Sequence, residues 1–222
     1  MKILIIGFQR SGTTLLRRII SAHPEVKKMF HEIFLMKKFA QKRSLYLFVK
    51  KHGINPDKDN WGEKTPYYPS MRGISVAKYI SQWEDFFEDD ARILHIVRHP
   101  VDVALSVNKM YGGNKIDIAI RTYKKIVPKI ISRFDDSSLV YSFKYEDLLT
   151  NSKKILPKIF SFCGLKPKIN IERYLSTSNK SKYRKLDPSR AFAHRGKDIP
   201  DYNLTGVLDE IDSRMGGTPY SD

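Results

Sequence analysis

The first apolar run of the chain is short, continuous and followed by a glycine. Residues 3 to 6, Ile-Leu-Ile-Ile, are apolar at every position, which is the pattern of a strand buried on both faces of a parallel sheet. From Thr13 onward the spacing becomes helical, and the apolar stripe consists of Leu15, Leu16, Ile19 and Ile20. His23-Pro24 ends this helix, because the residue before a proline is pushed out of the helical region. The pattern therefore predicts a strand, a glycine-containing turn and a helix, in that order.

The rest of the chain alternates between the same two patterns. We expect helices over 27 to 52, 74 to 90, 100 to 109, 116 to 134 and 152 to 162, and strands over 93 to 97 and 139 to 145. Gly53 suits the end of a helix, 54 to 73 has the composition of a loop, and Pro128 predicts a bend. Strands separated by helices indicate an α/β fold with a central, mainly parallel sheet flanked by helices. At 222 residues the chain is expected to form a single domain, 1–222.

Composition limits the classes of protein that fit this pattern. Cys163 is the single cysteine, so an intrachain disulfide and a multi-thiolate metal site are excluded. Because no apolar run is long enough for a signal-peptide core or a membrane span, we expect a soluble, cytoplasmic protein that does not engage a membrane. The net charge of +16 fits an anionic ligand, and it fits a lysine-rich solvated surface equally well.

The positive charge is concentrated between residues 166 and 197. This segment holds ten lysines and arginines and two acidic residues. The resulting excess of +8 is half of the net charge of +16. Ser, Asn, Tyr, Phe and Gly lie between the basic residues, and this composition suits a loop that closes over an anion. We therefore expect 166–197 to cover a cofactor or a substrate, with an ordinary solvated face as the alternative.

Residues 7 to 16, GFQRSGTTLL, join the first predicted strand to the first helix. Such a turn gathers free backbone N–H groups and the positive end of the helix dipole, and this arrangement binds phosphate. A nucleotide hydrolase needs a lysine directly after the second glycine, but Thr13 stands there. The basic residue is Arg10, which lies inside the loop. This displacement argues against a kinase or an ATPase.

The loop resembles the 5′-phosphosulfate-binding loop of sulfotransferases that use 3′-phosphoadenosine-5′-phosphosulfate (PAPS), although Gln9 stands where that family usually has proline. The resemblance implies a three-layer, P-loop-like fold in which the 5′ group is bound by Arg10, Ser11, Gly12, Thr13 and Thr14. A second motif of the family binds the 3′-phosphate, and ILHIVRHPVDVALS, 93 to 106, fits it with Arg98 and Ser106. Taken by itself, that stretch would be interpreted as a turn that caps a strand. Because it follows the first motif in the order that the family shows, it favours a cofactor site.

Weaker matches extend the resemblance from residue 3 to about residue 200, nearest to the tyrosylprotein and carbohydrate branches. KYEDLL, 144 to 149, implies that Tyr145 lines the adenine pocket, and GEKTPYY, 62 to 68, implies that Lys64 lies near the sulfuryl group. AFAHRGK, 191 to 197, and STSNKSK, 176 to 182, imply further cofactor contacts from Arg195, Gly196, Ser176, Ser178 and Lys180. For the last three, hydration of a loop is the alternative.

Sulfuryl transfer needs a nucleophile and a leaving group held in line, and stabilisation of the charge between them. The resemblance assigns this stabilisation to Arg10 and Lys64, so that no metal is required. An acceptor hydroxyl also needs a base. The tyrosylprotein-type stretch after His23-Pro24 favours Glu32, whereas an ungapped count from Arg10 falls on His31. Both remain candidates, and a polar position on an amphipathic helix is the alternative for Glu32.

These features together predict an enzyme, a PAPS-dependent sulfotransferase that releases adenosine 3′,5′-bisphosphate (PAP). Its acceptor would carry a hydroxyl group on a tyrosine or other phenol, a sugar or a small metabolite, and a basic pocket mouth suits an anionic acceptor. A P-loop kinase or nucleotide hydrolase is one alternative. A basic non-enzymatic module that binds anions is another, although nucleic acid is not expected as a partner.

Overall fold

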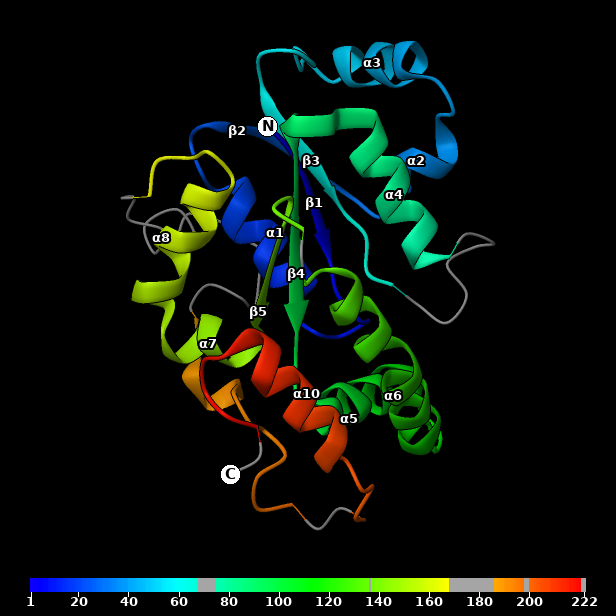
Figure 1. The fold of residues 1–222 in the computed structure, drawn as a ribbon, viewed down its shortest axis with the longest axis vertical. Helices are drawn as coiled ribbons and strands as arrows, with labels where there is room; N and C mark the ends of the chain where they lie inside the picture. The colour runs from blue at the N-terminus through cyan, green and yellow to red at the C-terminus, as the bar shows by residue number, and fades with distance from the viewer. Residues whose placement is uncertain (68–74, 136, 168–185, 198–199, 221–222) are drawn as a thin grey trace.

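The computed structural model describes residues 1–67, 75–135, 137–167, 186–197 and 200–220. One sheet has the strand order β2-β3-β1-β4-β5, and every neighbouring pair is parallel. The strands are β1 (Lys2–Ile6), β2 (Val26–His31), β3 (Asn60–Lys64), β4 (Ala91–Val97) and β5 (Val140–Lys144). Helices cover both faces of the sheet (Figure 1), which confirms the predicted α/β fold.

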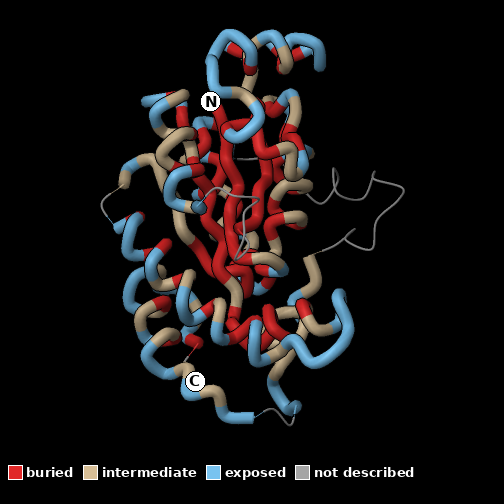
Figure 2. The backbone as a smooth tube through the Cα atoms, turned by 90° about the vertical axis from the view of Figure 1, so that its right-hand side faces the viewer, coloured by how far each residue is buried: buried red, intermediate tan, exposed pale blue. Residues whose placement is uncertain are grey.

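Each face of the sheet has its own apolar core. The helices on one face are α1 (Thr13–Ser21), α7 (Tyr145–Thr150) and α8 (Ser152–Phe162). Those on the other are α2 (Leu35–Lys38), α3 (Lys42–Lys51), α4 (Val76–Phe87), α5 (Pro100–Tyr111), α6 (Ile116–Arg133) and α10 (Thr205–Met215). Along β1, Ile3 and Ile5 enter the first core while Leu4 and Ile6 enter the second. The strand is therefore buried at every position, as the continuous apolar run predicts (Figure 2).

The prediction of one helix over 27 to 52 was wrong, because this stretch contains β2, α2 and α3. The buried residues of β2 are Val26, Met29 and Phe30, which have the i, i+3, i+4 spacing of a helix. A bulge between Val26 and Lys28 inserts an extra residue and shifts the strand register. A bulged edge strand therefore imitates helical periodicity.

Strand β3 lies inside the stretch 54 to 73 that we expected to be a loop. Its sequence, NWGEK, contains a glycine and two charged residues, yet all positions from Trp61 to Lys64 are buried. Gly62 pairs with Ile3 of β1, and a Cβ atom on Gly62 would collide with the carbonyl group of Ile3. The close approach of β1 therefore requires glycine here. The polar composition concealed the strand.

The other predicted elements are present with small shifts at their ends. Gly53 follows α3 with a φ of 71°, the left-handed conformation expected just past a helix C-terminus. Pro128 lies inside α6. The sequence reasoning did not predict α7 or α10. Within the described ranges, every helix is too short or too polar to cross a bilayer.

Candidate active site

The turn between β1 and α1 folds tightly before the helix begins. Gly12 has a φ of 101°, and its carbonyl accepts a hydrogen bond from the N–H of Leu16 at 3.1 Å. The Ser11 hydroxyl donates to the carbonyl of Phe8 at 2.6 Å, so this side chain closes the loop on itself. The first backbone N–H groups of a helix have no partner within the helix. The start of α1 is therefore a potential anion site.

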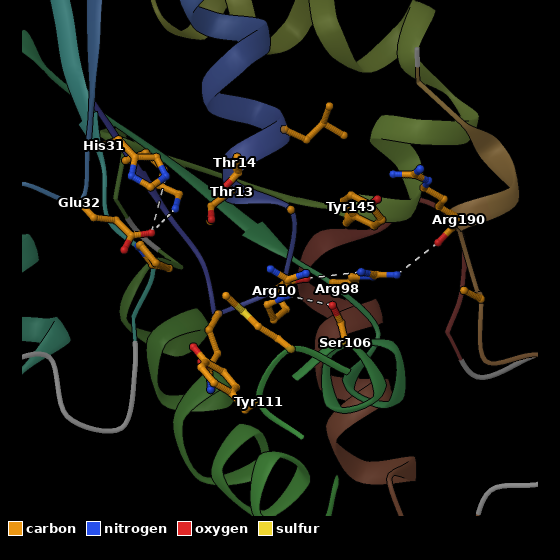
Figure 3. Close-up of a pocket in the computed structure, with 17 residues that line it drawn as sticks. Arg10, Thr13, Thr14, His31, Glu32, Arg98, Ser106, Tyr111, Tyr145 and Arg190 are labelled. Carbon is orange, nitrogen blue, oxygen red and sulfur yellow. Dashed lines mark hydrogen bonds and ion pairs between the residues drawn. The ribbon is translucent and has the colours of Figure 1, made fainter. Parts of the chain in front are cut away.

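A pocket of about 490 Å³ opens at this helix end, where the carboxyl ends of the five parallel strands meet (Figure 3). Its lining residues are Gln9, Arg10, Gly12, Thr13, Thr14, Leu15, His31, Glu32, Lys64, Pro66, Arg98, Ser106, Met110, Tyr111, Tyr145, Arg190 and Ala193. No group of three or more His, Cys, Asp or Glu suited to a metal ion occurs among the described residues. The pocket brings together most of the residues that the sequence motifs singled out.

Arginines line one half of the pocket. Arg10 Nε donates to the hydroxyl of Ser106 at 2.9 Å. Arg98 donates to the carbonyls of Arg10 and Arg190, both at 3.4 Å, and its guanidinium lies 4.6 Å from the ring centre of Tyr145. Within the described part of the chain, Arg98 Nε is buried without a hydrogen-bond partner. This guanidinium therefore has donor capacity left for an anion.

A buried carboxylate fixes this half of the pocket. Asp102, in the first turn of α5, lies 3.8 Å from Arg98 and accepts a hydrogen bond from the N–H of Ala193 at 3.1 Å. Burial alone would raise the pKa of Asp102, but the interaction with His194 and the charge of Arg98 outweigh burial and hold the pKa below its usual range. The ionised carboxylate joins the arginine to the end of the basic segment.

The opposite half of the pocket carries a lysine, a carboxylate and an imidazole. Lys64 forms an ion pair with Glu32, and His31 Nε2 lies 3.9 Å from the same carboxylate (Figure 3). Burial lowers the pKa of Lys64, and the pairing with Glu32 opposes this effect only in part. Burial and the charge of Lys64 also lower the pKa of His31, so its ring is neutral at pH 7. Glu32 and His31 are therefore both placed to accept a proton.

The turn that carries Glu32 is held by Glu63, a fully buried residue of β3. Glu32 and Phe34 have positive φ values of 52° and 58°. Glu63 accepts hydrogen bonds from the N–H groups of Phe34 and Leu35, the latter at 2.9 Å, and from the hydroxyl of Tyr79 at 2.7 Å. Such backbone conformations persist only where their surroundings hold them. The sequence reasoning missed Glu63, whose one signal was its place directly before Lys64.

Several predicted residues lie elsewhere. Ser11 is buried and does not line the pocket. Arg195 and Gly196 line a separate pocket of about 330 Å³, and the Arg195 guanidinium lies 4.2 Å from the ring centre of Phe192. Ser176, Ser178 and Lys180 lie outside the described residues. These placements leave the roles of all six residues as predictions.

Three lining residues escaped the sequence reasoning: Arg190, Met110 and Tyr111. Arg190 belonged to the basic segment, where charge alone did not distinguish it from its neighbours. Met110 follows Ser106 by four residues, and this spacing places two residues on the same face of a helix. The signal was therefore present once Ser106 had been assigned to the pocket.

The fold and the pocket define a P-loop-like α/β protein with a potential anion site at its first helix. The family model for the sulfotransferase domain matches residues 1–198, and the chain belongs to this family, whose members use PAPS. The protein is accordingly a sulfotransferase. Comparison with curated protein sequences found no significant match.

Solved structures share the fold at low sequence identity. The sulfotransferase domain of the Synechococcus PCC 7002 olefin synthase is 17% identical, with a TM-score of 0.72 over 99% of this chain and 96% of that one. The sulfotransferase domain from the curacin biosynthetic pathway is 16% identical, with a TM-score of 0.70 over 95% and 96%. Mouse sulfotransferase SULT7A1, complexed with PAP, is 15% identical, with a TM-score of 0.55 over 98% and 84%.

Proposed function

We propose that this sulfotransferase moves the sulfuryl group of PAPS to a hydroxyl acceptor bound in the pocket at the start of α1. One observation carries the proposal. The loop around Arg10 and the distant Arg98 line the same pocket as Glu32 and Lys64. Groups suited to binding a doubly anionic donor therefore lie beside groups suited to proton transfer.

The donor would lie along the arginine half of the pocket. Backbone N–H groups at the start of α1, together with Arg10, would bind the 5′-phosphate, and Tyr145 would contact the adenine. Arg98 and Ser106 would bind the 3′-phosphate, for which Arg98 Nε is buried and unpaired among the described residues. We further propose that 1–222 acts as one sulfotransferase domain, with 166–197 over the donor, because Arg190 and Ala193 of that segment line the pocket.

Proton transfer would take place in the other half of the pocket. The acceptor oxygen bonds to sulfur as the bond between sulfur and the 5′-phosphate oxygen breaks and PAP leaves. Arg10 and Lys64 would stabilise the negative charge on the sulfuryl and the departing oxygen. Glu32, which forms an ion pair with Lys64, would take the hydroxyl proton on its carboxylate. His31, 3.9 Å from that carboxylate, is the second candidate.

Calorimetric titration tests the donor assignment directly. We expect PAP to bind equally well in the presence of magnesium and of a chelator, because arginine and lysine side chains supply the positive charge. ATP should bind far more weakly, since Thr13 stands where a nucleotide hydrolase has its lysine. Magnesium-dependent binding of ATP, with little affinity for PAP, would instead support the kinase alternative.

Replacing Gly12 with alanine is expected to weaken PAP binding and to lower the free energy of unfolding. The φ of 101° is unfavourable for alanine by about 1–2 kcal/mol, and the added Cβ would collide with the ring of Tyr145, on which Arg98 rests. Thermal unfolding and PAP titration measure the two effects.

Gly53→Ala is the matched control for Gly12→Ala. Gly53 also has a positive φ, 71°, but a Cβ there meets nothing within 4 Å. This variant should lose stability and keep its affinity for PAP. If both variants bind PAP as the wild type does, contact between the loop and Tyr145 does not shape the donor site.

A further inference from the structure

Two large apolar side chains stand exposed at the edge of the proposed active site. Met110 and Tyr111, the last residues of α5, are 57% and 55% exposed and line the pocket. Only two other large apolar residues are so exposed in the described ranges, Ile118 at 53% and Leu47 at 55%. Ile118 lies in the first turn of α6, just after α5 in the chain, whereas Leu47 lies on α3 and does not line the pocket. Two of these four exposed apolar side chains therefore line the pocket.

The face that helix α5 turns to the pocket changes from polar to apolar along the helix. Asp102, Ser106 and Met110 follow one another at intervals of four residues and share this face. Asp102 forms an ion pair with Arg98, and the hydroxyl of Ser106 accepts a hydrogen bond from Arg10. The first two turns of α5 therefore contact the arginines that line one half of the pocket. Met110 lies about 6 Å further along the helix axis, at a rise of about 1.5 Å per residue. In the view of Figure 3, Tyr111 and Tyr145 lie on opposite sides of Arg10.

Met110 and Tyr111 line the same pocket as the residues of the proposed donor site. The donor site proposed above uses the loop before α1, Arg98, Ser106 and Tyr145, and it does not use Met110 or Tyr111. The Met110 side chain offers no strong hydrogen-bond donor, and neither does the ring face of Tyr111. Methionine adapts its shape to varied apolar partners. A polar acceptor would leave both side chains in contact with water or hydroxyl groups, whereas an apolar one would cover them.

We propose that Met110 and Tyr111 form the acceptor wall, and that the acceptor carries its hydroxyl group on an apolar aryl or alkyl body rather than on a sugar. The inference rests on the proposed function, because it requires the donor to occupy the arginine half. The hydroxyl would point toward Glu32 while the body lies on the wall. The two side chains would favour acceptors with an apolar body and would not require one particular shape of that body.

Binding of alkylphenols to the enzyme saturated with PAP tests the inference without knowledge of the natural acceptor. The series runs from 4-methylphenol to 4-butylphenol, with N-acetylglucosamine as the polar comparison. We expect Kd to fall by about two- to fourfold for each added methylene, the upper value being full burial of a CH₂ group. The sugar should bind more weakly than every phenol.

Three serine variants locate the apolar contact. Met110→Ser and Tyr111→Ser should flatten the dependence of Kd on alkyl length. Leu47→Ser is the matched control, because Leu47 has the same exposure but lies outside the pocket, and it should keep the wild-type dependence.

Three results would overturn the inference: a wild-type Kd that does not vary with alkyl length, tighter binding of the sugar, or a dependence left intact in both pocket variants. PAP affinity is measured first on every protein. If the wild type fails to bind PAP, the proposed function itself is refuted, and this inference with it. A failure confined to the acceptor series refutes only this inference.

Discussion

Arg98→Ala should bind PAP about 30- to 150-fold more weakly than the wild type. The loss corresponds to about 2–3 kcal/mol, the contribution of hydrogen bonds from a charged donor. The geometry supports a value in this range because Arg98 is already fixed by Asp102 and by the ring of Tyr145, so little side-chain entropy remains to be lost on binding. Titration calorimetry with PAP measures the effect.

Arg92→Ala is the appropriate control, because Arg92 lies near the start of β4 and Arg98 directly follows the end of that strand. Its Nε donates to the carbonyl of Phe162 at 3.0 Å, and its guanidinium also rests on an aromatic ring, at 5.9 Å. This variant should lose stability without losing PAP affinity. Arg98→Lys should fall between the wild type and Arg98→Ala, because lysine keeps the charge but not the planar fork of donors. An unchanged Kd for Arg98→Ala would remove Arg98 from the donor site.

The elements that sequence reasoning located best are those whose signals are local. The run Ile3 to Ile6 is apolar throughout because helices cover both faces of β1, and burial on both faces follows from the fold class alone. The turn after β1 could also be predicted, because Gly12 adopts a left-handed conformation directly before α1. Arg10 and Arg98 were identified by motifs that lie at the ends of such strands.

The features that escaped prediction depend on contacts between distant segments. The bulge in β2 gives it helical spacing, and β3 appears polar because Glu63 and Lys64 are buried by their partners rather than by apolar character. Glu32 was therefore placed on a helix, although it lies in a turn held by Glu63 of the neighbouring strand. The exposure of Met110 and Tyr111 is likewise a property of the assembled pocket. Charge and spacing alone reveal neither the contacts between these distant segments nor the exposure of the two side chains.

Glu32→Gln should reduce kcat by about 10²- to 10⁴-fold, the usual contribution of a general base, and leave PAP affinity nearly unchanged. Glutamine has nearly the shape of glutamate, so the turn at a φ of 52° need not change. The amide cannot accept the acceptor's proton, and the Lys64 ammonium loses its partner in the ion pair. Turnover of PAPS is measured with the fastest acceptor among a phenol, a tyrosine peptide and N-acetylglucosamine.

His31→Asn, compared with Glu32→Gln, decides between the two bases. If Glu32 is the base, His31→Asn retains most of the turnover, and kcat is lost at low pH as the carboxylate takes up a proton. If His31 is the base, the sensitivities of the two variants are reversed. The acid limb of the profile should then lie below the usual histidine range, because burial and Lys64 lower the pKa of His31. Full turnover by Glu32→Gln would therefore transfer the role to His31, without affecting the assignment of Arg98.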